Sequence, residues 1–411
     1  MTRMVRGRRP DRGRVIIAGG GFAGLACANA LDYRHFDVTL IDRRKAFEFT
    51  PNIHEIVSGV KRATDVRLDH REALAARQHR FIRGDVSSID PAERTVSVGR
   101  RTLRADALVL AFGAVDATYG IEGAEKYTLP FKDAEHTTAI HRTLEQALRA
   151  GERPKVWIIG AGLAGVEAVG EVLRSYRGKL GGLGLIEAQS ALLPTLTSSV
   201  GDHVASVCGE QDVECVTGDP VARITAKTIV LKSGRRLRSD ITVWTGGPAA
   251  PPLLEQSGLA PVSGWCPVED SLEHAEFPGI FAAGDIAQPP SVPTKQAYHA
   301  LDMGRHVALN LERRRKGLQL KIYRPVGKPT LMSFGDLDTV LVAGDYAAAG
   351  PALAAGKEAV FAATMAQLDQ RAIGRQLQAM LLRGQRAGEA LLWPSLRSID
   401  TLKRQASVKI L

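Results

Sequence analysis

Residues 15–31 read VIIAGGGFAGLACANAL, an apolar run that enters a glycine-rich turn and leaves it as a helix-like stretch. Residues 156–173, VWIIGAGLAGVEAVGEVL, repeat this arrangement in the second half of the chain. A strand before the spacing G-x-G-x-x-G and a helix after it indicate a dinucleotide-binding turn. The glycines of the two copies are Gly19, Gly21, Gly24, Gly160, Gly162 and Gly165. The repeat predicts an α/β fold with two Rossmann-like units.

Each glycine turn is followed by an acidic residue at the end of a second apolar run. Asp42 closes VTLID, 18 residues after Gly24, and Glu187 closes LGLIE, 22 residues after Gly165. Such glycines let the backbone approach a pyrophosphate at a helix N-terminus, and the acid accepts hydrogen bonds from a ribose diol. Two units predict two bound dinucleotides, most simply a flavin that is reduced by a nicotinamide. The alternative is two glycine turns of ordinary α/β packing.

Length and composition indicate a globular protein of two or three domains. The 411 residues are 45% apolar, and no run of 18 uncharged apolar residues predicts a membrane-spanning helix. The basic N-terminus leads into a strand rather than an apolar signal segment. We therefore expect a cytoplasmic protein, either free or peripheral on the cytoplasmic face of the membrane.

The net charge of +10 is concentrated at the two ends of the chain. Residues 1–14 carry a net charge of +5 and residues 371–411 a net charge of +6, which leaves the rest near −1. Basic segments are attracted to anionic lipid surfaces. Solvated tails are the alternative interpretation.

The cysteines argue against dithiol chemistry and against a metal site. The four cysteines show neither C-x-x-C nor any metal-ligand spacing. Cys208 and Cys215 lie seven residues apart across an expected helix-to-strand junction, where we do not expect a disulfide.

The second unit is expected to be inserted into the first. We assign residues 13–120 and 240–322 to an FAD-binding domain, 121–239 to an NADH-binding domain and 323–411 to a small C-terminal α+β region. We also expect a β-meander over residues 79–110 and a helix that starts near Thr294. In the C-terminal region we expect strands at LMSFGD and TVLVAGDY, and helix-like sequence from there to the end.

Several further segments resemble motifs of one family. GIFAAGDIA (279–287) is similar to a second FAD motif, and FTPNIHEIVSG (49–59) to F-x-P-x-x-x-E-x-x-x-G. VWTGG (243–247) matches a V-W-x-x-G stretch, and VPTKQAYHA (292–300) matches a K-x-[AG]-Y pattern. YRPVGKPTLMSFGDLDTVLVAG (323–344) looks like the start of a membrane and quinone region.

With these motifs the chain resembles the two-dinucleotide-binding flavoproteins, the pyridine nucleotide–disulfide oxidoreductase-like superfamily. The resemblance covers roughly residues 13–350 and is strongest to the quinone-reducing branch. That branch comprises type II NADH dehydrogenases, sulfide:quinone oxidoreductases and the apoptosis-inducing-factor-like ferroptosis suppressor. It implies FAD and NADH as cofactors and a quinone as acceptor.

The resemblance assigns site residues to both cofactors. The FAD residues are Gly19, Gly21, Phe22, Ala23, Gly24, Asp42, Arg43, Gly113, Gly284 and Asp285. The NADH residues are Gly160, Gly162, Gly165, Glu187 and Gly246. The residues at the reacting rings are Glu167, Lys295 and Gln296. Asp285 would bind the ribityl chain of the flavin.

The chain departs from the family pattern at three places. Ala111-Phe112-Gly113 replaces A-T-G, Ala300 replaces the second Gln of the quinone motif, and no cysteine follows Cys266. The last departure argues against sulfide oxidation by the family's cysteine route. A tryptophan-rich C-terminal anchor is not recognisable either.

Three residues have expected roles beside the flavin. Hydride transfer needs alignment of two cofactors rather than a general base. Lys295, together with a helix N-terminus, would stabilise the anionic reduced flavin, Gln296 would donate to a flavin or quinone carbonyl, and Glu167 would contact the nicotinamide end. A solvated lysine, an ordinary polar residue and a carboxylate at a helix start are the respective alternatives.

Glu187 favours NADH over NADPH. An acid at this position accepts from the ribose 2′-hydroxyl and repels a 2′-phosphate. The following Ala188 and Gln189 provide no arginine for such a phosphate.

The leading hypothesis is therefore an FAD enzyme that oxidises NADH and reduces a membrane quinone, with no nucleic acid as partner. A reductase of a small redox protein is the second hypothesis. An apoptosis-inducing-factor-like NADH-responsive protein whose basic ends bind nucleic acid is the third. Residues 371–386 show an apolar stripe opposite arginines, a pattern typical of a helix in a membrane interface, of a packed terminal helix or of a homodimer contact.

Overall fold

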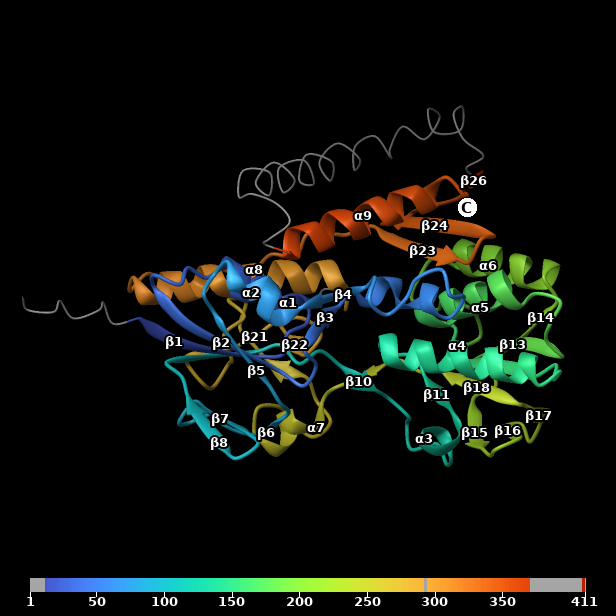
Figure 1. Ribbon diagram of the computed structural model, residues 1–411, viewed down its shortest axis with the longest axis horizontal. Helices are drawn as coiled ribbons and strands as arrows, with labels where there is room; N and C mark the ends of the chain where they lie inside the picture. The colour runs from blue at the N-terminus through green and yellow to red at the C-terminus, as the bar shows by residue number, and fades with distance from the viewer. Residues whose placement is uncertain (1–11, 292–293, 370–408, 411) are drawn as a thin grey trace, which may run out of the picture.

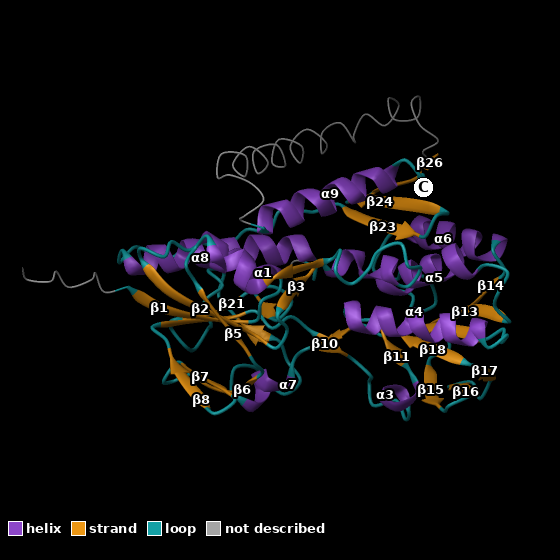
Figure 2. Ribbon diagram, in the orientation of Figure 1, coloured by secondary structure: helices purple, strands orange, loops and turns teal. Residues whose placement is uncertain are grey.

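The computed structural model describes residues 12–291, 294–369 and the backbone of 409–410 (Figure 1). Two five-stranded parallel sheets form its two halves (Figure 2). The first sheet has the order β21-β9-β1-β2-β5, with strands Ile280–Ala282, Ala107–Leu110, Gly13–Ala18, Phe36–Asp42 and Arg80–Arg83. The second has the order β11-β18-β12-β13-β14, with strands Leu129–Pro130, Ile241–Trp244, Lys155–Ile159, Gly182–Glu187 and Val213–Thr217. The predicted pair of Rossmann-like units is confirmed.

The second sheet is inserted into the first, because strand β21 of the first sheet follows all strands of the second in sequence. The chain crosses between the halves through β10 (Val115–Asp116) and β19 (Pro248–Ala249), which pair antiparallel. Each half also carries a three-stranded antiparallel sheet. These are β6-β7-β8 (Val86–Asp90, Thr95–Val98, Arg101–Arg104) and β15-β16-β17 (Val221–Ile224, Thr228–Leu231, Arg236–Arg238). Two short pairs complete the first half, β3-β4 (Ala46–Glu48, Arg67–Asp69) and β20-β22 (Cys266–Pro267, Ala287–Gln288).

Helices cover both sheets. In the first half they are α1 (Phe22–Ala30), α2 (His70–Ala75), α7 (Pro252–Gln256), α8 (Ala297–Arg315) and the 3₁₀ helix η1 (Thr50–Ile56). In the second half they are α3 (Ala124–Tyr127), α4 (Ala134–Arg149), α5 (Leu163–Tyr176) and α6 (Ser198–Glu210). Helices α1 and α8 pack closely, since a Cβ at Gly304 would lie 2.1 Å from the carbonyl oxygen of Ala23.

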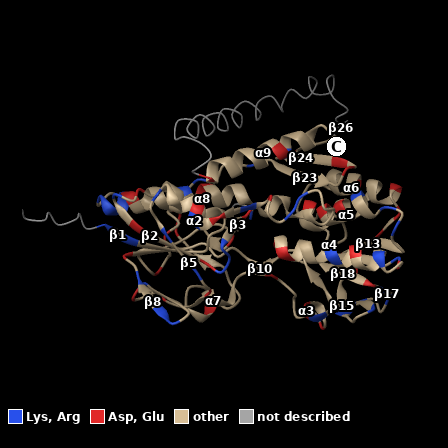
Figure 3. Ribbon diagram, viewed as in Figure 1, with Lys and Arg blue, Asp and Glu red and all other residues tan. Residues whose placement is uncertain are grey.

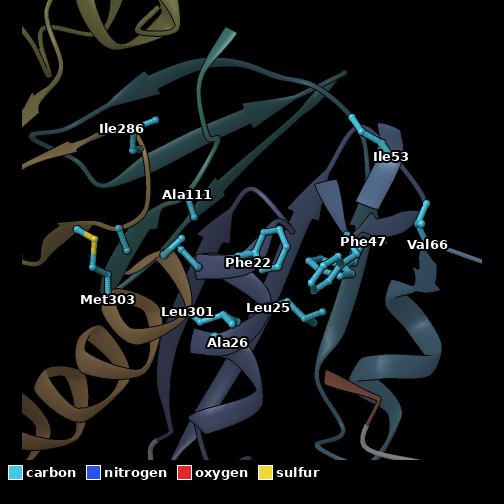
Figure 4. Packing of buried hydrophobic residues seen from close by; sticks show 14 of the residues in the cluster. Phe22, Leu25, Ala26, Phe47, Ile53, Val66, Ala111, Ile286, Leu301 and Met303 are labelled. Atoms are coloured by element: carbon cyan, nitrogen blue, oxygen red, sulfur yellow. The ribbon is translucent and has the colours of Figure 1, made fainter. Parts of the chain in front are cut away.

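The main hydrophobic core extends through both halves and the C-terminal region, and Figure 4 shows the part of it around α1, α8 and the first sheet. Phe22 of α1 packs edge-to-face on Phe47, with ring centroids 4.8 Å apart, and on Phe49, at 5.4 Å. Phe49 in turn meets Phe361 of helix α9 (Leu353–Leu368) at 5.0 Å. This aromatic row connects the nucleotide-binding half to the C-terminal region.

The C-terminal region is an antiparallel sheet covered by α9. Its order is β23-β24-β25-β26, with strands Thr330–Phe334, Asp338–Ala343, Tyr346–Ala349 and Lys409–Ile410. The sheet rests on α5 of the second half, where a Cβ at Gly170 would lie 2.3 Å from the backbone nitrogen of Gly335. Within the described part of the chain, no helix is long and apolar enough to cross a bilayer.

Some local predictions were wrong. The expected meander over residues 79–110 is wrong at both ends, because β5 and β9 belong to the parallel sheet and only β6 to β8 form a meander. The helix expected near Thr294 begins at Ala297. The helix-like sequence expected to the end of the chain is wrong at Lys409–Ile410, which form a strand. The amphipathic stripe of residues 371–386 lies outside the described residues.

Candidate active site

The first glycine turn is closed by packing on two sides and open on the third. Gly19 has φ +109°, and a Cβ there would lie 2.2 Å from the carbonyl oxygen of Ala111 on the neighbouring strand. A Cβ at Gly24 would lie 1.8 Å from the carbonyl oxygen of Gly19. A Cβ at Gly21, the N-cap of α1, would meet nothing within 4 Å. The open side therefore gives a phosphate group access to a helix N-terminus.

Asp42 stands at the end of β2 beside this turn. Its carboxylate accepts hydrogen bonds from the backbone nitrogens of Gly20 at 2.6 Å and of Arg44 at 2.8 Å. These two bonds fix the side chain next to the glycine turn, where an acid can accept from a ribose diol. The neighbouring Arg43 also faces the cavity that starts at this turn.

The second glycine turn has the same construction. Gly160 has φ +101°, a Cβ at Gly165 would lie 1.8 Å from the carbonyl oxygen of Gly160, and a Cβ at Gly162 would meet nothing within 4 Å. Glu187 ends β13 and accepts from the backbone nitrogens of Ala161 at 2.8 Å and of Gln189 at 2.9 Å. Both turns thus have an open glycine at a helix N-terminus and an acid fixed beside it.

A cavity of about 650 Å³ extends from the first turn to the second half and the C-terminal sheet. Twelve of the predicted site residues line it, namely Gly19, Gly21, Phe22, Ala23, Asp42, Arg43, Gly113, Glu167, Gly284, Asp285, Lys295 and Gln296. The other six lie outside its lining, namely Gly24, Gly160, Gly162, Gly165, Glu187 and Gly246. Gly246 packs on Trp244 instead, since its Cβ would lie 2.6 Å from that indole. The cavity therefore belongs mainly to the first dinucleotide.

Asp285 and Lys295 form one wall of the cavity. Asp285 follows Gly284, which has φ +78°, and burial raises the pKa of its carboxyl group although Lys295 opposes this shift. The ammonium of Lys295 donates to the backbone oxygen of Asp285 and lies 3.5 Å from the ring centroid of Trp265. Burial lowers the pKa of Lys295. Lys295 precedes α8 by two residues rather than lying in its first turn.

Gln296 connects this wall to the C-terminal sheet. It is the N-cap residue of α8, and its Nε2 donates to Oγ1 of Thr330 at 3.0 Å. Thr330 and its neighbours Pro329 and Leu331 also line the cavity. The side chain of Gln296 therefore lies where the first half meets the C-terminal region.

Glu167 lies in a buried charge cluster that joins all three parts of the protein. Its Oε1 accepts from Nζ of Lys357 at 2.5 Å and from the backbone nitrogen of Ser333 at 3.3 Å. The imidazole of His54 lies beside this ion pair. Its Nε2 is 3.3 Å from the Lys357 ammonium and its Nδ1 is 3.8 Å from the Glu167 carboxylate. Burial raises the pKa of Glu167, whereas Lys357 opposes the shift. Burial also lowers the pKa of His54 well below its ordinary value.

Sequence reasoning missed Lys357, His54, Trp265 and the pair Lys132 and Asp116. Lys132 and Asp116 line the cavity near the interdomain crossing, with Nζ and Oδ1 3.8 Å apart. A usable signal existed only for Lys357, an isolated lysine in the small-residue and apolar stretch LAAGKEAVFAATMAQL. A charge among such residues is expected to be paired when it is buried.

The residues of the first turn fit an FAD. The open side at Gly21 leaves room for a pyrophosphate at the N-terminus of α1, the fixed acid Asp42 is placed for a ribose, and the partly buried Asp285 faces the same cavity. A nucleotide bound along this line would place its ring end near Lys295, Gln296 and Glu167, which line the other part of the cavity.

Comparison with known proteins agrees with this geometry. Residues 13–304 match the family described as pyridine nucleotide-disulphide oxidoreductase. A type II NADH:quinone oxidoreductase of Staphylococcus aureus is 24% identical over 380 residues, which cover 85% of this chain and 94% of that protein. Among solved structures, NDH2 from Plasmodium falciparum in complex with NADH has a TM-score of 0.78 at 16% identity, over 90% of this chain and 97% of that one. The sulfide:quinone oxidoreductase of Aquifex aeolicus has a TM-score of 0.76 at 20% identity, over 87% and 91%.

Proposed function

Because the chain belongs to the pyridine nucleotide-disulphide oxidoreductase family, we propose that it is an FAD enzyme that oxidises NADH and reduces a membrane quinone. Membership makes it an oxidoreductase and implies FAD and NAD(P)H as cofactors. The observation that supports NADH oxidation with reduction of a quinone is the cavity. The first half, the second half and the C-terminal sheet all contribute residues to it. An acceptor can therefore approach the flavin from the side of Gln296 and Thr330.

The first turn would hold FAD through Gly21, Asp42 and Asp285, and the bound flavin would supply the chemistry of accepting a hydride and releasing electrons. Lys295 would place a positive charge beside the pyrimidine side of the ring. Gln296 has an amide that can donate to a carbonyl of the flavin or of a quinone. We also propose the division into an FAD-binding domain (13–120 and 240–322), an NADH-binding domain (121–239) and a C-terminal region (323–411).

NADH rather than NADPH is the proposed reductant. Glu187 accepts two backbone hydrogen bonds and so remains beside the second glycine turn, where a 2′-phosphate would meet its negative charge. The next residues, Ala188 and Gln189, are exposed and carry no positive charge that could compensate.

The Glu167 cluster suits the handling of a proton. Reduction of a quinone to a quinol takes up two electrons and two protons, whereas NADH supplies a hydride, so one proton has to come from water. Glu167 lines the cavity, so its carboxyl group is placed to pass that proton to a bound acceptor, and its Oε1 is held by the Lys357 ammonium. Burial raises the pKa of Glu167, which makes its carboxyl group more ready to bind a proton than an exposed glutamate.

Purified protein tests the proposal. Flavin absorbance should bleach on anaerobic addition of NADH and return on addition of a water-soluble short-chain quinone. Glu167→Gln should keep the bleaching and slow the return, whereas the exposed control Glu255→Gln should leave both unchanged. If NADH bleaches the flavin and only a small redox protein restores it, the quinone assignment is wrong and a reductase of such a protein replaces it. If NADH leaves the flavin oxidised, the reductant assignment is wrong.

A further inference from the structure

A basic and apolar surface lies outside the cavity, on the last turn of α8 and the segment that follows it. We call residues 313–328, RRRKGLQLKIYRPVGK, the strap. Its sixteen residues include seven Lys or Arg and no Asp or Glu. Figure 3 shows the cluster of basic residues at the end of α8, where the strap begins. The described body of the protein has no such concentration of one charge in its sequence.

The strap runs back along α8 and is fixed by its backbone. The backbone nitrogen of Lys321 donates to Oδ1 of Asn310 at 2.8 Å, and its carbonyl oxygen accepts from Nδ2 of Asn310 at 2.9 Å. Tyr323 is buried and its backbone nitrogen donates to the carbonyl oxygen of Asp270 at 2.7 Å. Lys328 pairs with Asp302 at 3.0 Å. The strap is therefore an ordered part of the surface.

With these anchors turned inward, three aliphatic side chains of the strap are left exposed. Leu318, Ile322 and Val326 are 49%, 58% and 63% exposed and are spaced four residues apart. Lys321 and Arg324 are exposed between them, and Lys316 is exposed two residues before Leu318. Aliphatic side chains thus alternate with cationic ones on an exposed, fixed surface.

We propose that the strap docks the protein on an anionic lipid bilayer. Leu318, Ile322 and Val326 would enter the boundary between headgroups and acyl chains, while the exposed Lys316, Lys321 and Arg324 contact lipid phosphates. Each basic residue near such a surface contributes about 1 kcal/mol of attraction. Nucleic acid fits less well, because single-strand binding uses exposed aromatic rings and the only aromatic residue of the strap, Tyr323, is buried.

The strap ends at the cavity. Residues 329–331, which follow it directly, line the cavity beside Gln296. Docking by the strap would therefore bring the bilayer close to the proposed acceptor side. The proposal concerns a surface and not the acceptor, so vesicle binding and quinone turnover can fail separately.

Flotation of the full chain with vesicles tests the charge requirement. Phosphatidylcholine vesicles that contain phosphatidylglycerol should bind the protein, pure phosphatidylcholine vesicles should not, and added salt should weaken the binding. Reversing Lys316, Lys321 and Arg324 to Glu should lower the affinity at least ~10-fold. Reversal of three exposed basic residues elsewhere, Arg100, Arg101 and Lys232, is the matched control and should change it little.

A local probe separates the strap from every other basic segment. In a Cys215→Ser background, which removes the exposed thiol of the described residues, Ile322→Cys carries a polarity-sensitive fluorophore. Its emission should shift to shorter wavelength when anionic vesicles are added. The same label at the exposed Val262, placed as Val262→Cys, should not respond. Binding without a shift at position 322 would place the membrane contact elsewhere, and an absence of vesicle binding would overturn the proposal outright. Oxidation of NADH by a soluble quinone should be the same for the strap variants as for the parent.

Discussion

Nζ of Lys357 in α9 lies 2.5 Å from Oε1 of Glu167 in α5, although the two residues are 190 positions apart in sequence. Their side chains are 9% and 13% exposed, so the pair is largely shielded from water. The ion pair ties the C-terminal region to the second half at the cavity wall. The proposed proton handling therefore involves a residue on which the stability of this wall also depends.

Lys357→Met should destabilise the protein by about 3 kcal/mol, because it leaves the Glu167 carboxylate buried without its cation. Urea unfolding would measure the loss. The double variant Lys357→Met/Glu167→Gln removes both charges and should recover much of the lost stability. Equal losses in the single and double variants would show that packing of the lysine stem matters rather than its charge.

His54 should make the protein less stable in acid. Its side chain is 1% exposed, and its pKa lies well below the ordinary 6.5 because burial, and next the charge of Lys357, disfavour the protonated ring. Below about pH 6.5 the unfolded chain binds a proton at His54 that the folded protein does not. The free energy of unfolding therefore falls by about 1.4 kcal/mol for each unit by which the pH drops below that value.

The variant His54→Gln isolates the pH-dependent contribution of His54 to the free energy of unfolding. The stability advantage of the parent over the variant should shrink by about 1.4 kcal/mol between about pH 7.5 and about pH 5.5. His35→Gln, at a half-exposed surface site, serves as control. A constant advantage across this range would mean that His54 has the same pKa in the folded and unfolded chain.

The two open glycines allow each cofactor to be removed separately. Gly21→Val and Gly162→Val both add a side chain where nothing lies within 4 Å, at ordinary extended φ values of −72°. Both should fold. Gly21→Val should purify without flavin colour, whereas Gly162→Val should be yellow and fail to bleach with NADH. Loss of flavin from Gly162→Val instead would reverse the assignment of the two units.

The parts of the fold that follow from local spacing were predictable from sequence. The turns at Gly19 and Gly160 and the acids Asp42 and Glu187 could be located because the strand, the glycines and the helix are neighbours in the chain. The ends of the expected meander could not, because a strand sequence does not reveal whether its partner is parallel or antiparallel. β5 and β9 look like the strands between them, yet they pair with β2 and β1.

The candidate site was predictable only in part, because only contacts between residues close in sequence can be inferred from the sequence. Asp285 and Lys295 stand within ten residues of each other, and both reach the cavity as expected. Trp265 contacts Lys295, and Lys357 contacts Glu167, from other parts of the chain, and one sequence carries no record of such contacts. Only the structure therefore shows that Lys295 is held by an indole and Glu167 by an ammonium.

Lys295 should raise the reduction potential of the bound flavin. Lys295→Met removes a positive charge from the cavity wall and should lower the two-electron potential by about 50 mV. Trp265→Leu should shift the potential in the same direction by less, because Lys295 loses the ring that positions it, while Trp265→Phe should retain most of the effect. A potential unchanged in Lys295→Met would place its charge away from the flavin ring.

The choice of nicotinamide should depend on Glu187 and on the exposed residue after it. In Glu187→Gln/Ala188→Arg the repelling carboxylate is gone and a guanidinium can pair with a 2′-phosphate. Ala188 is exposed, so the arginine has room without disturbing β13. The ratio of kcat/KM for NADPH over NADH should rise at least ~10-fold in the double variant, and less in either single variant. Ser190→Arg places the same charge two residues farther along the exposed loop and should leave the ratio nearly unchanged. A parent enzyme that already prefers NADPH would contradict the role given to Glu187.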